Sequence, residues 1–348
     1  MPAEVVFHPN WWHQNYGISF DKDYFFDADA SLESTRRMRE ELSARFPELG
    51  DDDEKPVSRP IIGGALLAAG FMISGIMGCD IRYSKSASPE VISPNLTEAQ
   101  IEKLRKINIF DTAIMQDFTR LIKEFKQKFG YVEGDINWEG VQNVALNLRG
   151  QQLFLDYFES PDLADVLLQS VADVIVQFLE FMASETDTSS VSVNRIVRRV
   201  DPKLVLHSNC TITMISAEHY RQFLLKYDHM LAAKFQPYGI HYCGQDLERM
   251  ASAFAEVKGL SFVDVGWGSD VEFCRAAFPD KFLSLRLSPM RMLSESPKVI
   301  AQDINDLLKV AAPLDQVGLC CINVDNGTPD ENIQTILRVA ADYHDDNT

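Results

Sequence analysis

The sequence predicts an α/β protein in which eight βα units close into a (β/α)8 TIM barrel behind an N-terminal helical and aromatic extension. Short apolar or β-branched runs start roughly every 20 to 35 residues with a helical segment between each pair, which is the pattern of repeated βα units. The 348 residues accommodate a barrel of about 250 residues plus an extension. A doubly wound open sheet is the alternative, but no glycine-rich nucleotide-binding motif supports it.

The first sixty residues differ in composition from the rest of the chain. They hold two aromatic clusters, a charged helical segment and an acidic run, at 7–13, 24–26, 31–46 and 51–54. Prolines at 56 and 60 follow the acidic run, as is typical of a linker. We therefore expect residues 1–60 to form an extension packed on a barrel of residues 61–348.

Helix starts and strands are readable in the remaining sequence. Thr97 with Gln100 forms a capping box, and proline stands at the first helical position after Ser160 and Ser296. The predicted strands are 204–207, 239–243, 260–265, 282–287 and 317–324, with 73–79 and 131–136 as candidates in the first half.

Charge and cysteine content limit the partners. The net charge of -18 would repel phosphate backbones and anionic lipids, so neither nucleic acid nor a membrane is expected as a partner. Residues 60–79 are uncharged and about long enough to span a bilayer, but they are better interpreted as a buried helix running into a strand. Six cysteines in a chain of this length are typical of reduced thiols in the cytoplasm.

A metal site is the main chemical prediction. His241 and Cys243 end a predicted strand, and alternation along a strand sends both side chains to the same side. Cys320 and Cys321 lie in another predicted strand, and either could reach the same end of the barrel, where such enzymes keep their sites. Thiolate and imidazole ligands favour zinc, and zinc in a catalytic site leaves one position to water or substrate.

These residues resemble the uroporphyrinogen decarboxylase superfamily, and within it the zinc-dependent corrinoid methyltransferases. "GIHYCG" is similar to the HxCG zinc motif of those enzymes, and "GLCCINVDNGTPDENI" is similar to their closing cysteine followed by TPxEN. The resemblance implies one zinc ion held by His241, Cys243 and Cys321, with Cys320 as the alternative third ligand. It also implies a corrinoid carried by a partner protein, because this chain has no cobalt-ligating DxHxxG sequence.

The long aromatic extension resembles that of the demethylating enzymes. We therefore expect transfer of a methyl group from a small O-methyl compound, which can be aromatic, to the corrinoid. Methylation of a thiol by a methylated corrinoid is the alternative. Decarboxylation without a cofactor is a minor one, because the decarboxylases' N-terminal arginine motif is missing. The resemblance also allows a homodimer.

Other residues have candidate roles. Asp80 falls where the decarboxylases carry their catalytic aspartate, and His207 could polarise a substrate or be a satisfied core histidine. Asp264 could be a fourth metal ligand or substrate contact, a partner of His241 or a helix-start carboxylate. Trp11 and Trp12, with Tyr16, could roof an aromatic substrate or clamp the extension to the barrel. Cys79, Cys210 and Cys274 are interpreted as core or near-site thiols.

Overall fold

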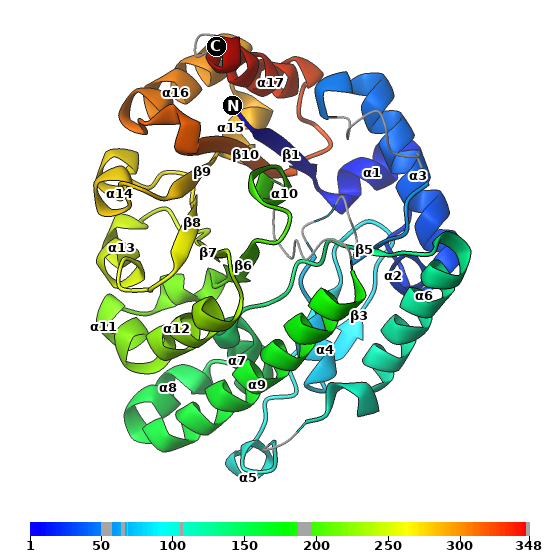
Figure 1. Ribbon diagram of the computed structural model, residues 1–348, viewed down its shortest axis with the longest axis vertical. Coiled ribbons are helices and arrows are strands. Elements are labelled where there is room, and N and C mark those ends of the chain that lie inside the picture. The colour runs from blue at the N-terminus through cyan, green and yellow to red at the C-terminus, as the bar shows by residue number, and fades with distance from the viewer. Residues whose placement is uncertain (50–57, 64–66, 68, 105–106, 187–195, 346–348) are drawn as a thin grey trace.

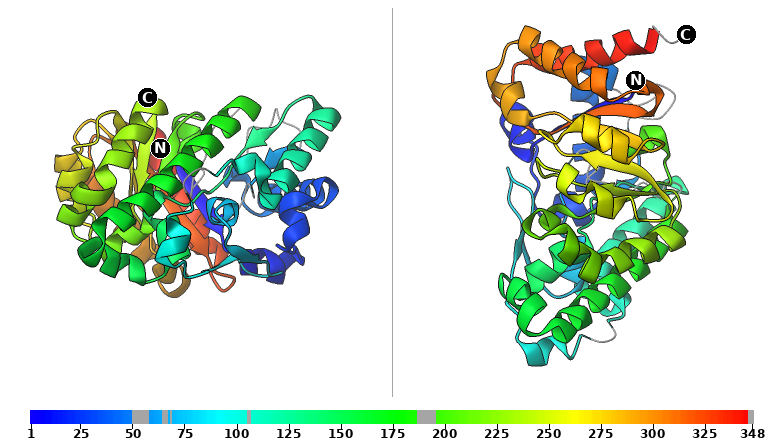
Figure 2. Two further views of the ribbon diagram at one scale, coloured as in Figure 1. Left: turned by 90° about the horizontal axis from the view of Figure 1, so that it is seen from below. Right: turned by 90° about the vertical axis from the view of Figure 1, so that its left-hand side faces the viewer.

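Eight parallel strands surround a common centre in the computed structural model, which describes residues 1–49, 58–63, 67, 69–104, 107–186 and 196–345 (Figure 1). Six of them form one sheet in the order β1-β10-β9-β8-β7-β6, and β2 pairs with β5 in a second parallel sheet. The short hairpin β3–β4 stands apart as an antiparallel pair. Helices lie outside the strands (Figure 2), so the architecture is the predicted TIM barrel.

The strands are β1 (Ala3–Phe7), β2 (Ile61–Ile62), β3 (Asp80–Arg82), β4 (Glu90–Ile92), β5 (Glu133–Gly134), β6 (Val205–Ser208), β7 (Tyr238–His241), β8 (Leu260–Val265), β9 (Phe282–Arg286) and β10 (Val317–Val324). The longer helices are α1 (Pro9–Tyr16), α3 (Ala28–Arg45), α6 (Ala113–Phe129), α7 (Val141–Arg149), α8 (Gln152–Glu159), α9 (Pro161–Glu185), α12 (Leu225–Lys234), α16 (Pro297–Val310) and α17 (Asp330–Asp345). Shorter ones are α2 (Lys22–Phe26), α4 (Met72–Ile76), α5 (Glu98–Ile101), α10 (Ile196–Val200), α11 (Ala217–His219), α13 (Glu248–Phe254), α14 (Val271–Ala277) and α15 (Pro289–Ser294), with the 3-10 turn η3 at Cys210–Met214.

Alternation along the strands divides their side chains between two hydrophobic clusters. The larger cluster lies between strands and helices and takes Ile240, Val263 and Leu283. The smaller one fills the barrel interior and takes Leu206, Phe262, Cys320 and Ile322, together with residues of α10. Helix α10 lies in the middle of the ring in Figure 1, so it closes one end of the barrel.

The boundary predicted at residue 60 is wrong in one respect. Residues 3–7 form β1, which pairs along its whole length with β10, so the chain begins with a strand of the barrel (Figures 1 and 2). The rest of the N-terminal segment then forms helices α1 to α3 on the outside. The all-buried run Ala3–Phe7 is too short for a periodicity to be visible, which explains why the sequence alone does not reveal it. The acidic run 51–54 lies outside the described residues.

Most predicted elements of the second half are confirmed, and one predicted strand of the first half is wrong. Residues 72–76 form the helix α4 instead of part of a strand at 73–79, since buried apolar runs of this length fit either structure. Helices α9 and α16 begin at the predicted prolines, and α5 has the predicted capping box.

Helix α9 is the one described helix that is long and apolar enough to cross a membrane. Its most apolar window is 56% buried inside the protein. It packs against α4, α7 and α8, so its apolar length is explained by its place in the core.

Candidate metal centre

Three soft donor atoms converge at the carboxyl ends of β6 and β7. The thiols of Cys210 and Cys243 and an imidazole nitrogen of His241 all lie within 4.8 Å of one another. Cys210 begins η3 two residues after β6, His241 ends β7, and Cys243 follows it by two residues. The two strands are neighbours in the sheet, with Ser208 in register with His241.

The period of two along each strand brings these side chains inward. Leu204 and Leu206 face the barrel interior, so Ser208 continues that face, and Cys210 follows at the same spacing. The Ser208 hydroxyl and the Cys210 thiol are 3.7 Å apart. On β7 the outward position is Ile240 and the inward one is His241.

Asp264 on β8 fixes the orientation of His241. It lies opposite His241 in register, is fully buried, and accepts a hydrogen bond from the Nδ1 atom of the imidazole. Because Asp264 holds Nδ1, Nε2 is the nitrogen left for a metal ion or another partner. In this structure Nε2 lies 3.3 Å from Nη1 of Arg286, the last residue of β9.

The two thiols are not equivalent. A hydrogen bond from Cys243, followed by the charge of His241, holds the pKa of Cys210 well below its usual value. The same hydrogen bond, together with burial, raises the pKa of Cys243. Burial lowers the pKa of His241, but the nearby Cys210 thiolate and the Asp264 carboxylate outweigh it and raise this pKa to about 9. The group therefore holds a thiolate stabilised by neighbouring donors.

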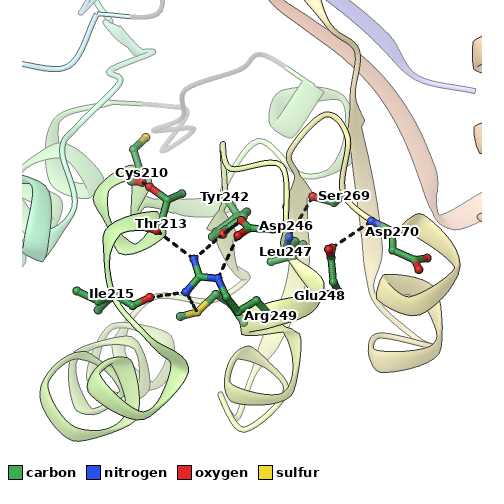
Figure 3. Close-up of polar contacts among 11 residues, drawn as sticks. Cys210, Thr213, Ile215, Tyr242, Asp246, Leu247, Glu248, Arg249, Ser269 and Asp270 are labelled. Atoms are coloured by element: carbon green, nitrogen blue, oxygen red, sulfur yellow. Dashed lines mark hydrogen bonds and ion pairs between the residues drawn. The ribbon is translucent and has the colours of Figure 1, made fainter.

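Arg249 ties the loop that carries Cys210 to the loop that carries Cys243 (Figure 3). Its guanidinium donates to the backbone oxygens of Thr213, at 3.1 Å, and Ile215 in the first loop. It also donates to Asp246 in the second loop, at 3.1 Å, and Asp246 accepts from the Tyr242 hydroxyl at 2.5 Å. One side chain on α13 thus holds both cysteine loops at a fixed separation.

The loops that follow β7 and β8 pack with almost no space between their backbones. A Cβ atom on Gly266 would lie 1.8 Å from the backbone oxygen of Gly244, a distance that no side chain can accommodate. The Leu247 N–H also donates to the Ser269 hydroxyl at 3.1 Å, and the Asp270 N–H donates to the Glu248 carboxylate at 3.1 Å (Figure 3). Glycine at 244 and 266 therefore allows the close approach that places Cys243 beside Cys210.

The donor set fits a metal ion with a preference for soft ligands. Two thiols and one imidazole at mutual distances below 4.8 Å match three corners of a tetrahedral zinc site. Cys210 and Cys243 are partly exposed while His241 is buried, so the group is open on one side. Asp264 contacts His241 on the nitrogen away from the thiols, which is the arrangement of a carboxylate that orients a metal-binding histidine.

The structure corrects the third metal ligand that the resemblance implies, which is Cys321. Cys321 is fully buried in the cluster between strands and helices, because it occupies an outward position of β10. Cys320, the alternative, faces inward but lies in the apolar cluster inside the barrel with Leu206 and Phe262. Burial raises the pKa of both thiols. The structure gathers Cys210 with His241 and Cys243 in place of either.

His207 is a satisfied core histidine. It faces outward from β6, stacks on Trp138 with ring centroids 5.2 Å apart, and contacts Asp228 through Nδ1 at 2.7 Å. Its Nε2 accepts from the Val141 N–H at 3.1 Å. Both ring nitrogens are occupied, so the predicted role in polarising a substrate is not supported by its position.

The remaining predicted residues lie apart from Cys210, His241 and Cys243, which together form the candidate metal-ligand group. Asp80 is exposed and begins the hairpin strand β3, and it is not a member of the group. Trp11 and Trp12 are fully buried against Phe7, so they clamp the N-terminal segment and do not line an open site. The Arg45 guanidinium covers the Trp11 ring at 5.0 Å. Tyr16 stands beside both tryptophans, at 5.4 and 6.0 Å.

Two residues near the group are absent from the sequence-based predictions of ligands and substrate contacts. Cys210 is predicted only as a core or near-site thiol, although its even spacing from Leu204 and Leu206 indicates a side chain on the inward face. Arg286 ends a predicted strand, and its position beside His241 became visible only when β8 and β9 were placed side by side.

The fold and the donor set together define a TIM-barrel protein with a thiolate- and imidazole-rich centre at the carboxyl ends of its strands. The family model described as uroporphyrinogen decarboxylase (URO-D) matches residues 67–343. The chain belongs to this family.

Two solved structures are similar over nearly the whole chain. A methyltransferase from Methanosarcina mazei has a TM-score of 0.68 and 14% sequence identity, with 99% of this chain and 94% of that one covered. A B12-independent methionine synthase from Shewanella sp. W3-18-1, in complex with selenomethionine, has a TM-score of 0.50 and 9% identity, with 99% and 98% covered. At these identities the likeness shows the fold. A comparison with curated protein sequences gives no match.

Proposed function

We propose that this protein is a zinc-dependent methyltransferase that moves a methyl group from a small methylated substrate to the cobalt of a corrinoid held by a partner protein. It acts in the cytoplasm, and its zinc ligands are Cys210, His241 and Cys243. The observation that carries the proposal is the convergence of two thiols and one imidazole within 4.8 Å at the end of a barrel where this fold places its chemistry.

The similar solved structures support the reaction type. One is a methyltransferase and the other a B12-independent methionine synthase, and both align with almost the full length of this chain. Corrinoid dependence rests on the family resemblance of the "GIHYCG" sequence.

The protein's own residues have separable tasks in this proposal. Cys210 and Cys243 supply thiolates, and His241 supplies Nε2 because Asp264 holds the other ring nitrogen. Arg249 keeps the two cysteine loops together. A zinc ion bound there would supply Lewis acidity toward a heteroatom of the substrate, which favours departure of that atom from its methyl group.

The test combines metal analysis with a methyl-transfer assay. The purified protein is mixed with cob(I)alamin and a panel of methoxylated and methylamine compounds, and methylcobalamin is followed by its visible absorption. We expect about one zinc per chain, and a methylated product only with the zinc-loaded protein. Cys210→Ala and Cys243→Ala should lose both metal and activity.

Cys321→Ala and Cys274→Ala are the matched controls, because both cysteines are buried outside the metal-ligand group. They should keep the metal. Zinc lost from Cys321→Ala and kept by Cys210→Ala would contradict the ligand set. Reaction of methylcobalamin with a thiol, but of no methyl donor with cob(I)alamin, would assign the thiol-methylating direction, and decarboxylation that survives removal of zinc would overturn the proposal.

A further inference from the structure

Arg286 connects the metal-ligand group to a cavity. It ends β9 on the inward side, two positions after Ser284, and its Nη1 lies 3.3 Å from Nε2 of His241. The same side chain lines a cavity of about 450 Å³. This volume is within the range of pockets that hold small organic ligands.

The cavity has mainly apolar walls. They come from the loop after β8, the end of β9, and the helices α15 and α16. The apolar lining residues are Trp267, Leu287, Met292, Ile300, Ile304 and Leu307.

The other charged residues of the cavity are already paired. Arg291 binds Asp303 at 2.6 Å, and Asp306 binds Lys309 at 2.6 Å. The Ser288 hydroxyl accepts from the Arg291 N–H at the start of α15. Arg291, Asp303 and Asp306 therefore have charged partners, whereas the lining residue Arg286 contacts His241.

The guanidinium of Arg286 has unused donors. Among the described residues its hydrogen-bond partner is Nε2 of His241, and its buried Nε has no partner. An arginine guanidinium stays protonated in proteins, so this side chain carries a positive charge. The carboxylate of Asp264 itself contacts His241.

Metal binding would release Arg286 from its one described partner. Because Asp264 holds Nδ1, a metal ion at this group takes Nε2, the atom that Arg286 now contacts. A partly buried guanidinium without an acceptor is unfavourable, and a carboxylate satisfies it with two parallel hydrogen bonds.

We infer that Arg286 binds the carboxylate of the substrate, so the methylated substrate is an organic acid whose hydrocarbon part fills the apolar cavity. The inference rests on the proposed function for the methyl group but concerns binding, which is measurable without the corrinoid. Arg286 then determines specificity by fixing one end of the substrate next to the metal-ligand group.

Calorimetric titration of the zinc-loaded protein tests this with two matched pairs of ligands. 3-Methoxybenzoate is compared with 3-methoxybenzyl alcohol, and methoxyacetate with 2-methoxyethanol. In at least one pair, the wild-type protein should bind the acid roughly 10- to 100-fold more tightly than the alcohol. Arg286→Gln should remove this preference while leaving the zinc content and the affinity for the alcohol unchanged, and Arg286→Lys should retain part of it.

Arg291→Gln is the matched control, since it removes a charge that is already paired in the same cavity. It should change the affinity for the acid less than about threefold. Loss of zinc from Arg286→Gln would mean that Arg286 balances the thiolates, and it would overturn the inference. Equal or absent binding of acid and alcohol by the wild-type protein in both pairs would overturn it too. Acid-selective binding without any methyl transfer would instead contradict the proposed function alone.

Discussion

Each of the adjacent strands β6 and β7 carries a histidine that is paired with a buried aspartate. The two histidines face opposite sides of the sheet. His207 and Asp228 lie on the outer side of β6, while His241 and Asp264 lie on the inner side of β7 and β8. Asp228 also accepts from the hydroxyls of Tyr220 and Tyr238 at 2.7 and 2.6 Å. The first pair joins a strand to a helix, and the second orients a proposed metal ligand, although each joins the Nδ1 atom of a histidine to an aspartate.

Replacing Asp264 by Asn should weaken zinc binding by roughly 10- to 100-fold, because the carboxylate that fixes the imidazole and strengthens its basicity is lost. Competition with a chelator measures this affinity. Asp228→Asn is the matched control: it should lower the free energy of unfolding and leave the zinc affinity of the folded protein unchanged. Equal zinc affinities for Asp264→Asn and the wild-type protein would show that Asp264 does not orient His241.

Glu139 makes stability depend on pH in an unusual direction. It is buried and accepts from the backbone N–H groups of Ile73 and Ser74 at 3.0 and 3.4 Å. Burial raises its pKa above the ordinary value of 4.5 despite these hydrogen bonds. The folded state therefore holds this proton more tightly than the unfolded state does, so the contribution of Glu139 to stability falls as pH rises above about 4.5.

Glu139→Gln should remove this pH-dependent loss of unfolding free energy, since the amide keeps a hydrogen-bond acceptor but does not titrate. Urea unfolding at several pH values measures it, with Glu124→Gln on the exposed face of α6 as the control. An identical pH dependence in Glu139→Gln and the wild-type protein would rule out this role of Glu139.

At the scale of elements, the metal-ligand group depends on loops that follow strands. Cys210 and Cys243 each lie two residues beyond their strand, where no sheet hydrogen bonds hold them. Their positions depend on Arg249 and on the close approach of Gly244 and Gly266.

Arg249→Gln should lower zinc affinity by about tenfold while changing the free energy of unfolding by less than about 1 kcal/mol, because Arg249 is partly exposed and its ion pair with Asp246 is a surface one. Zinc affinity and urea unfolding are measured on the same preparation. Arg221→Gln, which removes a similar ion pair with Glu256 at 2.6 Å, should change neither value strongly. A large loss of stability without a change in zinc affinity would make Arg249 a purely structural residue.

At the scale of the whole molecule, β5 and β6 belong to different sheets, and ion pairs with buried carboxylates link β5 to α10. Arg198 on α10 donates to Glu133 at 3.1 Å and to Asp135 at 3.4 Å. Glu133 is also paired with the buried Arg59, which precedes β2. Helix α10 thus fastens the second sheet to the barrel interior.

Arg198→Met should lower the free energy of unfolding by about 3 kcal/mol, because it leaves two buried carboxylates with less compensating charge. Urea unfolding measures this, and Arg338→Met on the exposed side of α17 serves as the control. A change no larger than that of the control would mean that the apolar contacts of α10 suffice to close the barrel.

The fold class and two of the three proposed ligands follow from local sequence patterns. The strands of the second half were readable because each is an apolar run next to a well-capped helix, and β8 and β10 have the predicted bounds. His241 and Cys243 were readable because both lie on one strand and its extension, where a period of two fixes their common side.

The third proposed ligand, Cys210, and the side chains around the three ligands depend instead on how distant strands pair. The choice among Cys210, Cys320 and Cys321 depends on which face of its strand each cysteine occupies and on its position along the barrel axis. Both follow from the pairing of strands that are far apart in the chain. The same holds for Arg286 and for β1, whose partner β10 lies more than 300 residues away. A local sequence pattern predicts which side of a strand a side chain faces. Whether side chains from different strands meet at one site depends on the register between those strands.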